Sequence, residues 1–175
     1  MPFLLRSIRK AKWYENPDLP WLSQNELQAD ALQDLKTDSN TISVWYIVDD
    51  HSNKERIITA LAATRQYAVQ FDYFLLKEHY IREINIKIVE RQGDSPDNSI
   101  NSWHRDLVEL SAEKLMLLAR SIQQNAQIER IPARDIRRFL THALLSGRFD
   151  STKMNLTAEV LTGIIKLIGD QQLQV

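Results

Sequence analysis

The sequence predicts an α+β fold, with a small mixed sheet and two helices in the N-terminal half and three helices in a C-terminal half packed on that sheet. Three observations support this prediction. Runs rich in β-branched and aromatic residues precede a loop-forming stretch at residues 92–98, helical spacing of apolar residues follows it, and capping signals mark both N-terminal helices. We expect an α/β half over residues 1–91, a loop over 92–100 and a helical half over 101–175, forming one compact domain.

The chain begins with a strand and a helix. Residues 3–13 mix apolar and basic side chains, and we interpret them as the first strand, although their spacing also fits a short helix. Ser23 is followed three residues later by Glu26, which is the spacing of a capping box. Apolar residues at helical spacing follow, so a helix is predicted over residues 24–36.

A buried strand and a second helix come next. Residues 41–48 are dense in β-branched and aromatic side chains, which favours a strand near the centre of the sheet. Ser52 and Glu55 repeat the capping-box spacing, so a second helix is predicted to continue to about residue 67. Two more strands are predicted, at residues 73–76 and 84–89.

No strand is predicted after Arg91, and the rest of the chain is interpreted as three helices. The longest, at about residues 100–124, would span roughly 36 Å and lie across the whole sheet. Its apolar side chains share one broad face, which contains Leu107, Val108, Leu115, Leu118 and Ile122.

Two shorter helices complete the prediction. Pro132 suits a first helical turn and Gly147 suits the position just after a helix end, so these residues bracket the second of the three helices. Leu156 and Leu161 have the spacing of a hydrophobic staple at the start of the third helix, which we expect to end at Gly169.

The composition excludes several classes of function. Cysteine is absent, which removes disulfides, thiol nucleophiles and thiolate metal sites. None of the four glycines precedes Gly93, so the first half lacks a phosphate-binding loop of the usual kind. The net charge is −1, so only local patches favour binding of nucleic acid. Apolar runs are too short for a signal peptide or a membrane span, so we expect a cytoplasmic protein that does not contact a membrane. We also expect no metal and no cofactor.

The strongest candidate for a binding surface is a group of arginines on the second of the three C-terminal helices. On a helical wheel of about 100° per residue they fall opposite the apolar stripe, at Arg130, Arg134, Arg137 and Arg138. Guanidinium groups pair well with phosphates and carboxylates, so we expect a non-catalytic binding protein with an acidic partner, either nucleic acid or protein. A solvated helix face explains the same residues, and no aromatic side chain lies among them to stack on bases.

Arg137 is also followed, after four intervening residues, by His142. This spacing resembles the arginine and histidine motif of HEPN-type ribonucleases, and the resemblance covers only residues 137–142. It implies RNA cleavage with these two residues at the site.

Two carboxylates and an imidazole follow the predicted central strand, at Asp49, Asp50 and His51. Oxygen and imidazole ligands at the end of a buried strand suit a hard metal ion. Adjacent residues of a strand face opposite sides, however, so the two carboxylates converge only if the chain turns. We favour a loop leading into the cap at Ser52.

His104 is a possible polar site, because the helical wheel places it near Leu107 on the buried face of the long helix. Arg105 and Asp106 are expected to point outward. A buried histidine needs partners for its ring nitrogens. A general base in a cleft and a structural histidine bonded to backbone both fit, and the structural role is the commoner one.

An enzyme hypothesis for the first half rests on the order of residues along the chain. A basic residue in the first strand, Arg6 or Arg9, is followed by Ser43 in a later strand and Glu90 at the end of another. This layout resembles that of ADP-ribosyltransferases, in which the arginine and serine hold NAD and the glutamate directs the transfer. A further alternative is an accessory or structural subunit that assembles through the long helix.

Overall fold

The computed structural model describes residues 1–13, 22 and 26–172. It divides into two compact units, which we name the sheet unit and the helical unit. The sheet unit consists of Met1–His51, Asp72–Arg91 and Trp103–Arg130. The helical unit consists of Ser52–Phe71, Gln92–Ser102 and Ile131–Val175. The two units alternate along the chain, and one of the changes from the sheet unit to the helical unit lies between Arg91 and Gln92.

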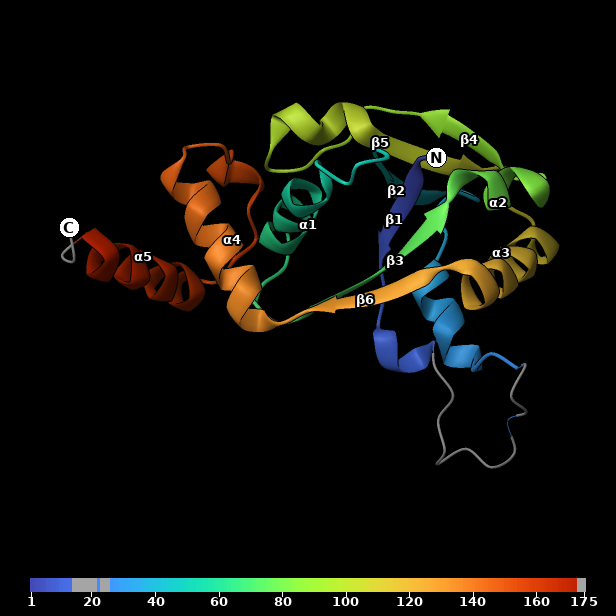
Figure 1. The fold of residues 1–175 in the computed structure, drawn as a ribbon, viewed down its shortest axis with the longest axis horizontal. Helices are drawn as coiled ribbons and strands as arrows, with labels where there is room; N and C mark the ends of the chain where they lie inside the picture. Colours follow the sequence, from blue (N-terminus) through green and yellow to red (C-terminus); the bar gives the residue numbers. More distant parts are fainter. Residues whose placement is uncertain (14–21, 23–25, 173–175) are drawn as a thin grey trace. The chain divides into compact units, whose positions relative to one another are not determined.

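The sheet unit is built on one antiparallel sheet with the strand order β4-β5-β2-β1-β3-β6 (Figure 1). A mixed sheet was predicted, whereas the sheet is antiparallel. Together with the helices, it confirms the predicted α+β class. Its strands are β1 (Phe3–Ser7), β2 (Ile42–Ile47), β3 (Phe71–Lys77), β4 (Lys87–Glu90), β5 (His104–Val108) and β6 (Gln127–Ile131).

Strand pairing places alternate residues on opposite faces of the sheet. Leu4 lies opposite Tyr46 of β2 and Leu76 of β3, and these residues share one face. That face packs against α2 (Glu78–Glu83), α3 (Ala112–Asn125) and the 3-10 helix η2 (Ala29–Leu35). The apolar core that they enclose includes Leu4, Ala31, Ile42, Val44, Leu76, Ile81, Leu107, Leu118 and Ile122.

The described part of the helical unit contains three α-helices, of which α1 packs on α4 and α4 packs on α5. Their bounds are α1 (Lys54–Ala63), α4 (Ala133–Leu145) and α5 (Ala158–Gln172). Buried apolar side chains line the contacts between them, among them Ile57, Ile58, Ile136, Leu140 and Ile164. Pro132 precedes α4, and Gly147 follows it with a φ of +64°, so glycine supplies the left-handed conformation that ends the helix, as predicted.

A loop of the helical unit, residues 92–102, is held by buried polar side chains. Asp97 receives hydrogen bonds from Arg56 of α1, at 2.6 Å from Nε and 3.1 Å from Nη2. The hydroxyl of Ser95 donates to the Asn101 side chain at 2.7 Å. These bonds join the loop to α1 and to the short 3-10 helix η3 (Asn98–Trp103).

The long helix predicted at residues 100–124 is wrong. The segment forms η3, then strand β5, and then α3, which begins after Ser111. β5 pairs with β2 on one side and β4 on the other, so sheet hydrogen bonds outweigh its helical spacing. Glu109 has a φ of +58°, which turns the chain between β5 and α3. β6 is a second strand in the half that was predicted to be helical.

Two helices and one strand of the first half also differ from prediction. The segment predicted as a helix at residues 24–36 contains η2, a 3-10 helix, and the proposed cap at Ser23 lies outside the described residues. α1 begins after Asn53, so the N-cap is Asn53 and not Ser52 as the predicted capping box requires. The strand predicted at residues 84–89 begins only at Lys87, because α2 ends at Glu83 and a turn follows in which Asn85 has a φ of +55°.

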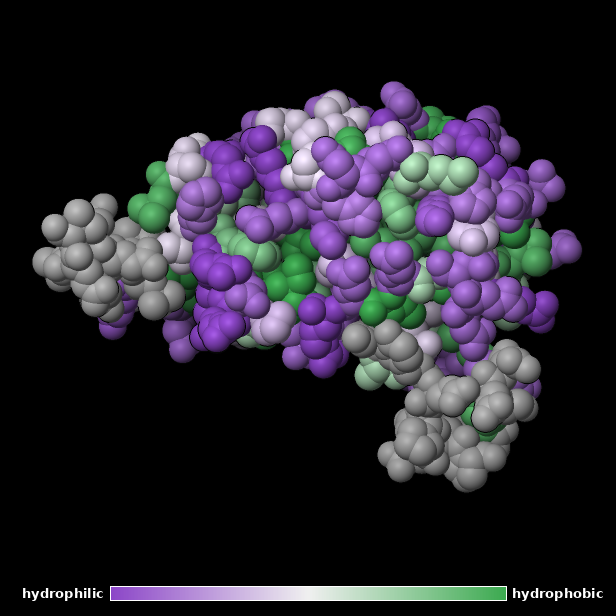
Figure 2. Space-filling view, viewed as in Figure 1, coloured by the Kyte–Doolittle hydropathy of each residue, from purple (hydrophilic) through white to green (hydrophobic). Residues whose placement is uncertain are grey.

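Hydrophilic side chains cover most of the surface visible in Figure 2, and hydrophobic ones occupy smaller areas between them. Several large apolar side chains are nevertheless exposed. In the sheet unit they include Met116 and Leu117 of α3, and in the helical unit they include Tyr67, Val69, Leu145 and Ile165.

Candidate functional site

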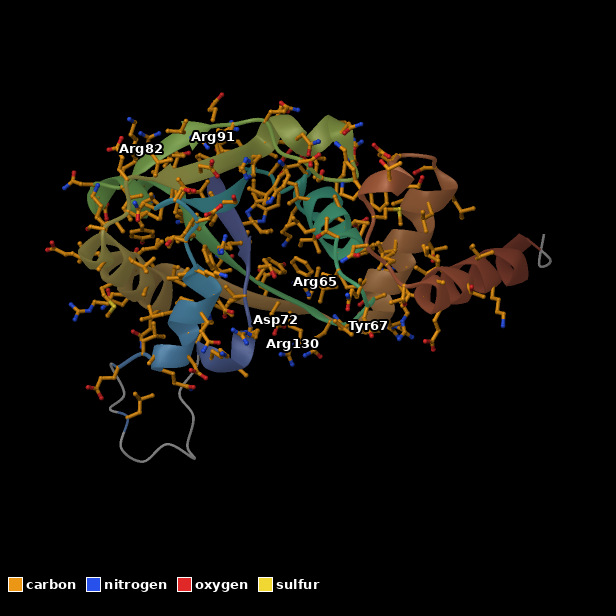
Figure 3. The ribbon with its side chains drawn as sticks, turned by 180° about the vertical axis from the view of Figure 1, so that it is seen from behind. Arg65, Tyr67, Asp72, Arg82, Arg91 and Arg130 are labelled. Carbon is orange, nitrogen blue, oxygen red and sulfur yellow. The ribbon has the colours of Figure 1, made fainter. Side chains whose placement is uncertain are left out.

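Arg130 belongs to strand β6 and not to the basic helix, which corrects the sequence prediction. Its guanidinium pairs with both carboxylate oxygens of Asp72 on β3, at 2.6 Å and 2.9 Å, and the two side chains lie next to each other in Figure 3. This bidentate pair joins neighbouring strands of the sheet. Arg130 therefore has a structural role within the sheet unit, whereas the arginines of α4 belong to the helical unit.

The other three predicted arginines, Arg134, Arg137 and Arg138, are all exposed on α4. Asp135 lies 3.9 Å from Arg134 and 3.5 Å from Arg138, so one carboxylate serves two of the guanidinium groups. Among the residues that the structure describes, no carboxylate lies within 4.0 Å of the Arg137 guanidinium. Arg137 is therefore the cation of this helix that has no internal counterion in the described part of the chain.

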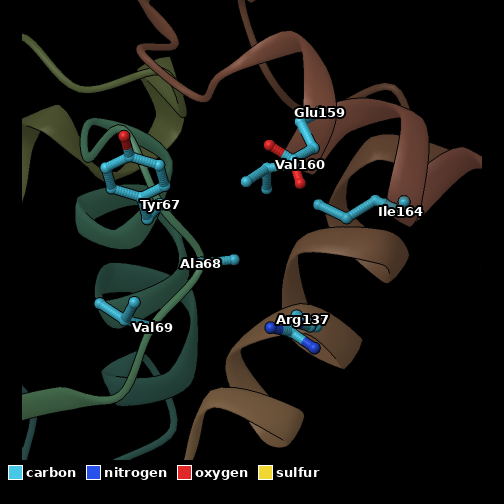
Figure 4. A pocket seen from close by; sticks show the side chains of 8 residues that line it. Tyr67, Ala68, Val69, Arg137, Glu159, Val160 and Ile164 are labelled. Carbon is cyan, nitrogen blue, oxygen red and sulfur yellow. The ribbon is translucent and has the colours of Figure 1, made fainter.

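Arg137 lines a groove within the helical unit, with a volume of about 560 Å³ (Figure 4). One wall is the loop that follows α1, and the other comes from α4 and α5. We name it the helical-unit groove, and its lining consists of Tyr67, Ala68, Val69, Arg137, Glu159, Val160, Gly163 and Ile164.

The groove is apolar along its floor and exposes apolar side chains at its rim. Ala68 and Ile164 are buried, whereas Tyr67 is 57% exposed and Val69 is 49% exposed. Glu159 is the acidic residue of the lining, and it does not lie within ion-pair distance of Arg137. The lining therefore offers apolar contact area together with two separated charges of opposite sign.

Backbone hydrogen bonds hold the two walls of the helical-unit groove together. The N–H of Thr157 donates to the carbonyl of Gln66 at 3.0 Å, and the N–H of Asn155 donates to the carbonyl of Ala63 at the same distance. The guanidinium of Arg65 lies 4.1 Å from the centre of the Phe71 ring. The loop that carries Tyr67 and Val69 is thus anchored at both ends, which favours a preformed groove.

Of the four residues in the ADP-ribosyltransferase resemblance, the structure brings Arg6 to the backbone of Ser43 but places the Ser43 and Glu90 side chains on opposite faces of the sheet. Arg6 donates to the backbone carbonyls of Asp34 and Ser43, at 2.9 Å and 2.7 Å, and burial lowers its pKa. Arg9 pairs with the Asp34 carboxylate. Ser43 is paired with Asp106 of β5, and Glu90 is paired with the adjacent residue, Arg105. Adjacent residues of a strand face opposite sides, so Ser43 and Glu90 lie on opposite faces of the sheet.

His104 is the first residue of β5 and is mostly buried, whereas the prediction placed it on a helix. Its Nε2 lies 3.7 Å from Asp106 Oδ1, and its Nδ1 is buried without a hydrogen-bond partner among the described residues. Asp106 is buried and not outward-facing as predicted; it accepts a hydrogen bond from Ser43 and pairs with Arg91 at 3.3 Å. Burial lowers the pKa of His104, while the Asp106 carboxylate acts in the opposite direction.

Asp49, Asp50 and His51 form a turn after β2. Asp49 pairs with the N-terminal ammonium at 2.8 Å, and the ring of His51 packs edge-on against Phe3 at 4.8 Å. Within residues 1–13, 22 and 26–172, no three side chains of the metal-binding kinds come together. In the same ranges, no helix is both long enough and apolar enough to cross a bilayer.

Arg137 and His142, which carry the ribonuclease resemblance, both lie on α4. Five positions of an α-helix correspond to a rotation of about 140°, so the two side chains leave the helix in different directions. Only Arg137 of the pair lines the helical-unit groove.

The sequence interpretation missed the groove because its walls come from distant segments. The sequence predicts the end of a helix at about Tyr67 and no helix or strand at Val69. Their exposure next to buried neighbours depends on the packing of α4 and α5, which one sequence does not reveal. Comparisons of the chain with protein-family models, with curated proteins and with solved structures find no match.

Proposed function

We propose that this protein is a non-catalytic binding protein whose helical-unit groove holds a short segment of an acidic protein partner. Apolar side chains of that segment would enter the groove, and its carboxylates would pair with the arginines of α4. The observation that carries the proposal is the position of Arg137, a cation without a described counterion in the wall of an otherwise largely apolar groove.

Protein fits this surface better than nucleic acid. Phosphate binding draws on several cations together. Here Arg130 is paired with Asp72, Asp135 lies between Arg134 and Arg138, and Glu159 adds a negative charge to the groove. An apolar floor matches amino-acid side chains, and a separate carboxylate on the partner matches Arg137.

The size of the groove sets the scale of the expected affinity. Burial of one Leu or Phe side chain contributes about 1.5–3 kcal/mol. An exposed pair between arginine and a carboxylate adds about 0.2–1 kcal/mol. Two such side chains and one or two ion pairs contribute about 3–8 kcal/mol before the cost of association, so we expect a weak complex with a dissociation constant on the order of millimolar or above.

An array of 12-residue peptides that combine Asp and Glu with Leu, Ile and Phe tests the proposal. We expect the full chain to select members of this array, and Arg137→Glu to lose them. Arg120→Glu is the matched control, because Arg120 is an exposed arginine of α3 outside the groove. This substitution changes the net charge by the same amount as Arg137→Glu. Val69→Asp should weaken binding by removing apolar contact area from the rim.

Three results would overturn the proposal. The first is that the chain selects no acidic peptide, and the second is that wild type and Arg137→Glu bind the selected peptides equally. The third is that the protein binds a mixed pool of duplex and single-stranded nucleic acid with a steep salt dependence, and that Arg137→Glu but not Arg120→Glu abolishes this binding, which would identify the surface as a phosphate site.

A further inference from the structure

A second cavity, of about 370 Å³, lies within the sheet unit and is independent of the proposed peptide groove. Its volume lies within the range of about 300–1,000 Å³ typical of small-molecule sites. Strands β2, β4 and β5 provide part of the lining, and helix α2 and Trp103 provide the rest. We name it the sheet-unit pocket.

The central charge of the sheet-unit pocket is Arg105 of β5. Its side chain is only 13% exposed, and its guanidinium lies 5.3 Å from the centre of the Tyr46 ring. Nη1 of the guanidinium donates to the backbone carbonyl of His104 at 2.8 Å, and Nη2 lies 3.0 Å from the carboxylate of Glu90. Protein contacts therefore fix the orientation of this cation, and Glu90 occupies part of its donor surface.

Glu90 is a weakly held counterion. It is the last residue of the edge strand β4, and its side chain is 82% exposed. Ion pairs with so exposed a partner contribute little to stability, because water solvates the carboxylate nearly as well as the guanidinium does. A carboxylate that enters the pocket can therefore take the place of Glu90 on Arg105, and Glu90 can turn into solvent.

The rest of the lining indicates what should be attached to that carboxylate. Trp103, Tyr46 and Ile88 provide aromatic and apolar surface next to Arg105. Arg82 and Glu78 also line the pocket and pair with each other on α2, so their charges are already satisfied. A flat ring suits these walls, since aromatic side chains and ligands pack by stacking or edge contact.

We propose that the sheet-unit pocket binds a small aromatic carboxylate. The carboxylate pairs with Arg105 in place of Glu90, and the ring packs against Trp103 and Tyr46. Aromatic amides lack the charge that this exchange requires, so the pocket distinguishes the acid from the amide.

Titration of the full-length, ¹⁵N-labelled protein with benzoate tests this inference, with benzamide as the neutral probe. We expect benzoate to shift the Trp103 indole and the Arg105 resonances, and benzamide to leave them nearly unchanged. Glu90→Gln should tighten benzoate binding about fivefold, because it removes the competing carboxylate. Glu109→Gln is the matched control, since Glu109 is an exposed carboxylate of the same unit that pairs with Lys87 at 3.0 Å outside the pocket.

Arg105→Gln should abolish benzoate binding, and its thermal unfolding is compared with wild type because the side chain is mostly buried. The Glu90→Gln result does not depend on that variant. Equal shifts from benzoate and benzamide would overturn the inference, as would unchanged or weaker benzoate affinity in Glu90→Gln. Neither result bears on the peptide groove, because Arg137 belongs to the other unit.

Discussion

Asp97 shows how one residue organises the loop of the helical unit. It is almost fully buried and accepts hydrogen bonds from Arg56 and Ser99. Burial alone would raise the pKa of Asp97, but these hydrogen bonds and the Arg56 charge lower it below its ordinary value of 3.8. Because the folded pKa lies below the unfolded one, the carboxylate stabilises the fold above pH 4, and this stabilisation is lost as the pH falls through the folded pKa.

We therefore expect Asp97→Asn to lower the free energy of unfolding by about 1–3 kcal/mol at pH 7, because it leaves Arg56 without its buried partner. The difference between variant and wild type should shrink below pH 4. Urea unfolding at several pH values measures both effects. Asp94→Asn is the control, since Asp94 is an exposed acid of the same loop. If Asp94→Asn lowered the free energy of unfolding as much as Asp97→Asn, the stabilising role assigned to the buried Asp97 carboxylate would be contradicted.

His104 gives a second prediction at this scale. Burial lowers the pKa of its imidazole below the ordinary 6.5, and Asp106 opposes that effect by favouring the charged ring. Asp106→Asn should therefore lower the midpoint of His104 further. A titration followed by NMR of the imidazole nitrogens measures the midpoint in both proteins. A higher midpoint in Asp106→Asn would show that the carboxylate does not act on this ring.

At the scale of elements, the sequence predicts correctly those helices and strands that are specified by residues close together in the chain. β2 and the end of α4 at Gly147 were predictable, because dense β-branched residues and a helix-ending glycine act within a few positions. β5 was not, because it gains its hydrogen bonds from β2 and β4, which are distant in sequence. The same reason explains Arg130, whose partner Asp72 lies on another strand.

The turn at Glu109 provides a direct test of whether residues 100–124 form one helix or form β5 followed by α3. With a φ of +58°, Glu109 occupies a conformation that glycine adopts without strain, so Glu109→Gly should leave the free energy of unfolding unchanged or raise it slightly. In a continuous helix the same change would cost about 1 kcal/mol. Arg120→Gly, inside α3, should show that cost. Urea unfolding of both variants compares them, and equal losses would favour the helix.

At the scale of the whole molecule, each unit is assembled from three segments that alternate along the chain. The sequence break at residues 92–98 is a loop of the helical unit, and it begins where the chain leaves the sheet unit after Arg91. The candidate site was only partly predictable for a related reason. Arg137 was evident from its helix, whereas the groove beside it requires the loop at Tyr67 and helix α5.

A fragment of residues 1–91 should therefore fail to fold. It lacks β5, which lies between β4 and β2, and β6, which borders β3. β4 would lose its pairing partner, and the core face would lose α3. Circular dichroism and the dispersion of amide resonances report the outcome. A fragment with dispersed resonances and cooperative unfolding would show that the first half is a domain by itself.

The measurement that tests the central claim most directly is a charge exchange between Arg137 and a bound peptide. An acidic peptide selected by the wild type, and a copy with Lys in place of the carboxylate that contacts Arg137, are each titrated into wild type, Arg137→Glu and Arg120→Glu. We expect the acidic peptide to bind wild type and Arg120→Glu, and only the Lys peptide to bind Arg137→Glu with restored affinity. Equal preference for the acidic peptide in all three proteins would contradict the claim that Arg137 and its groove form the binding site.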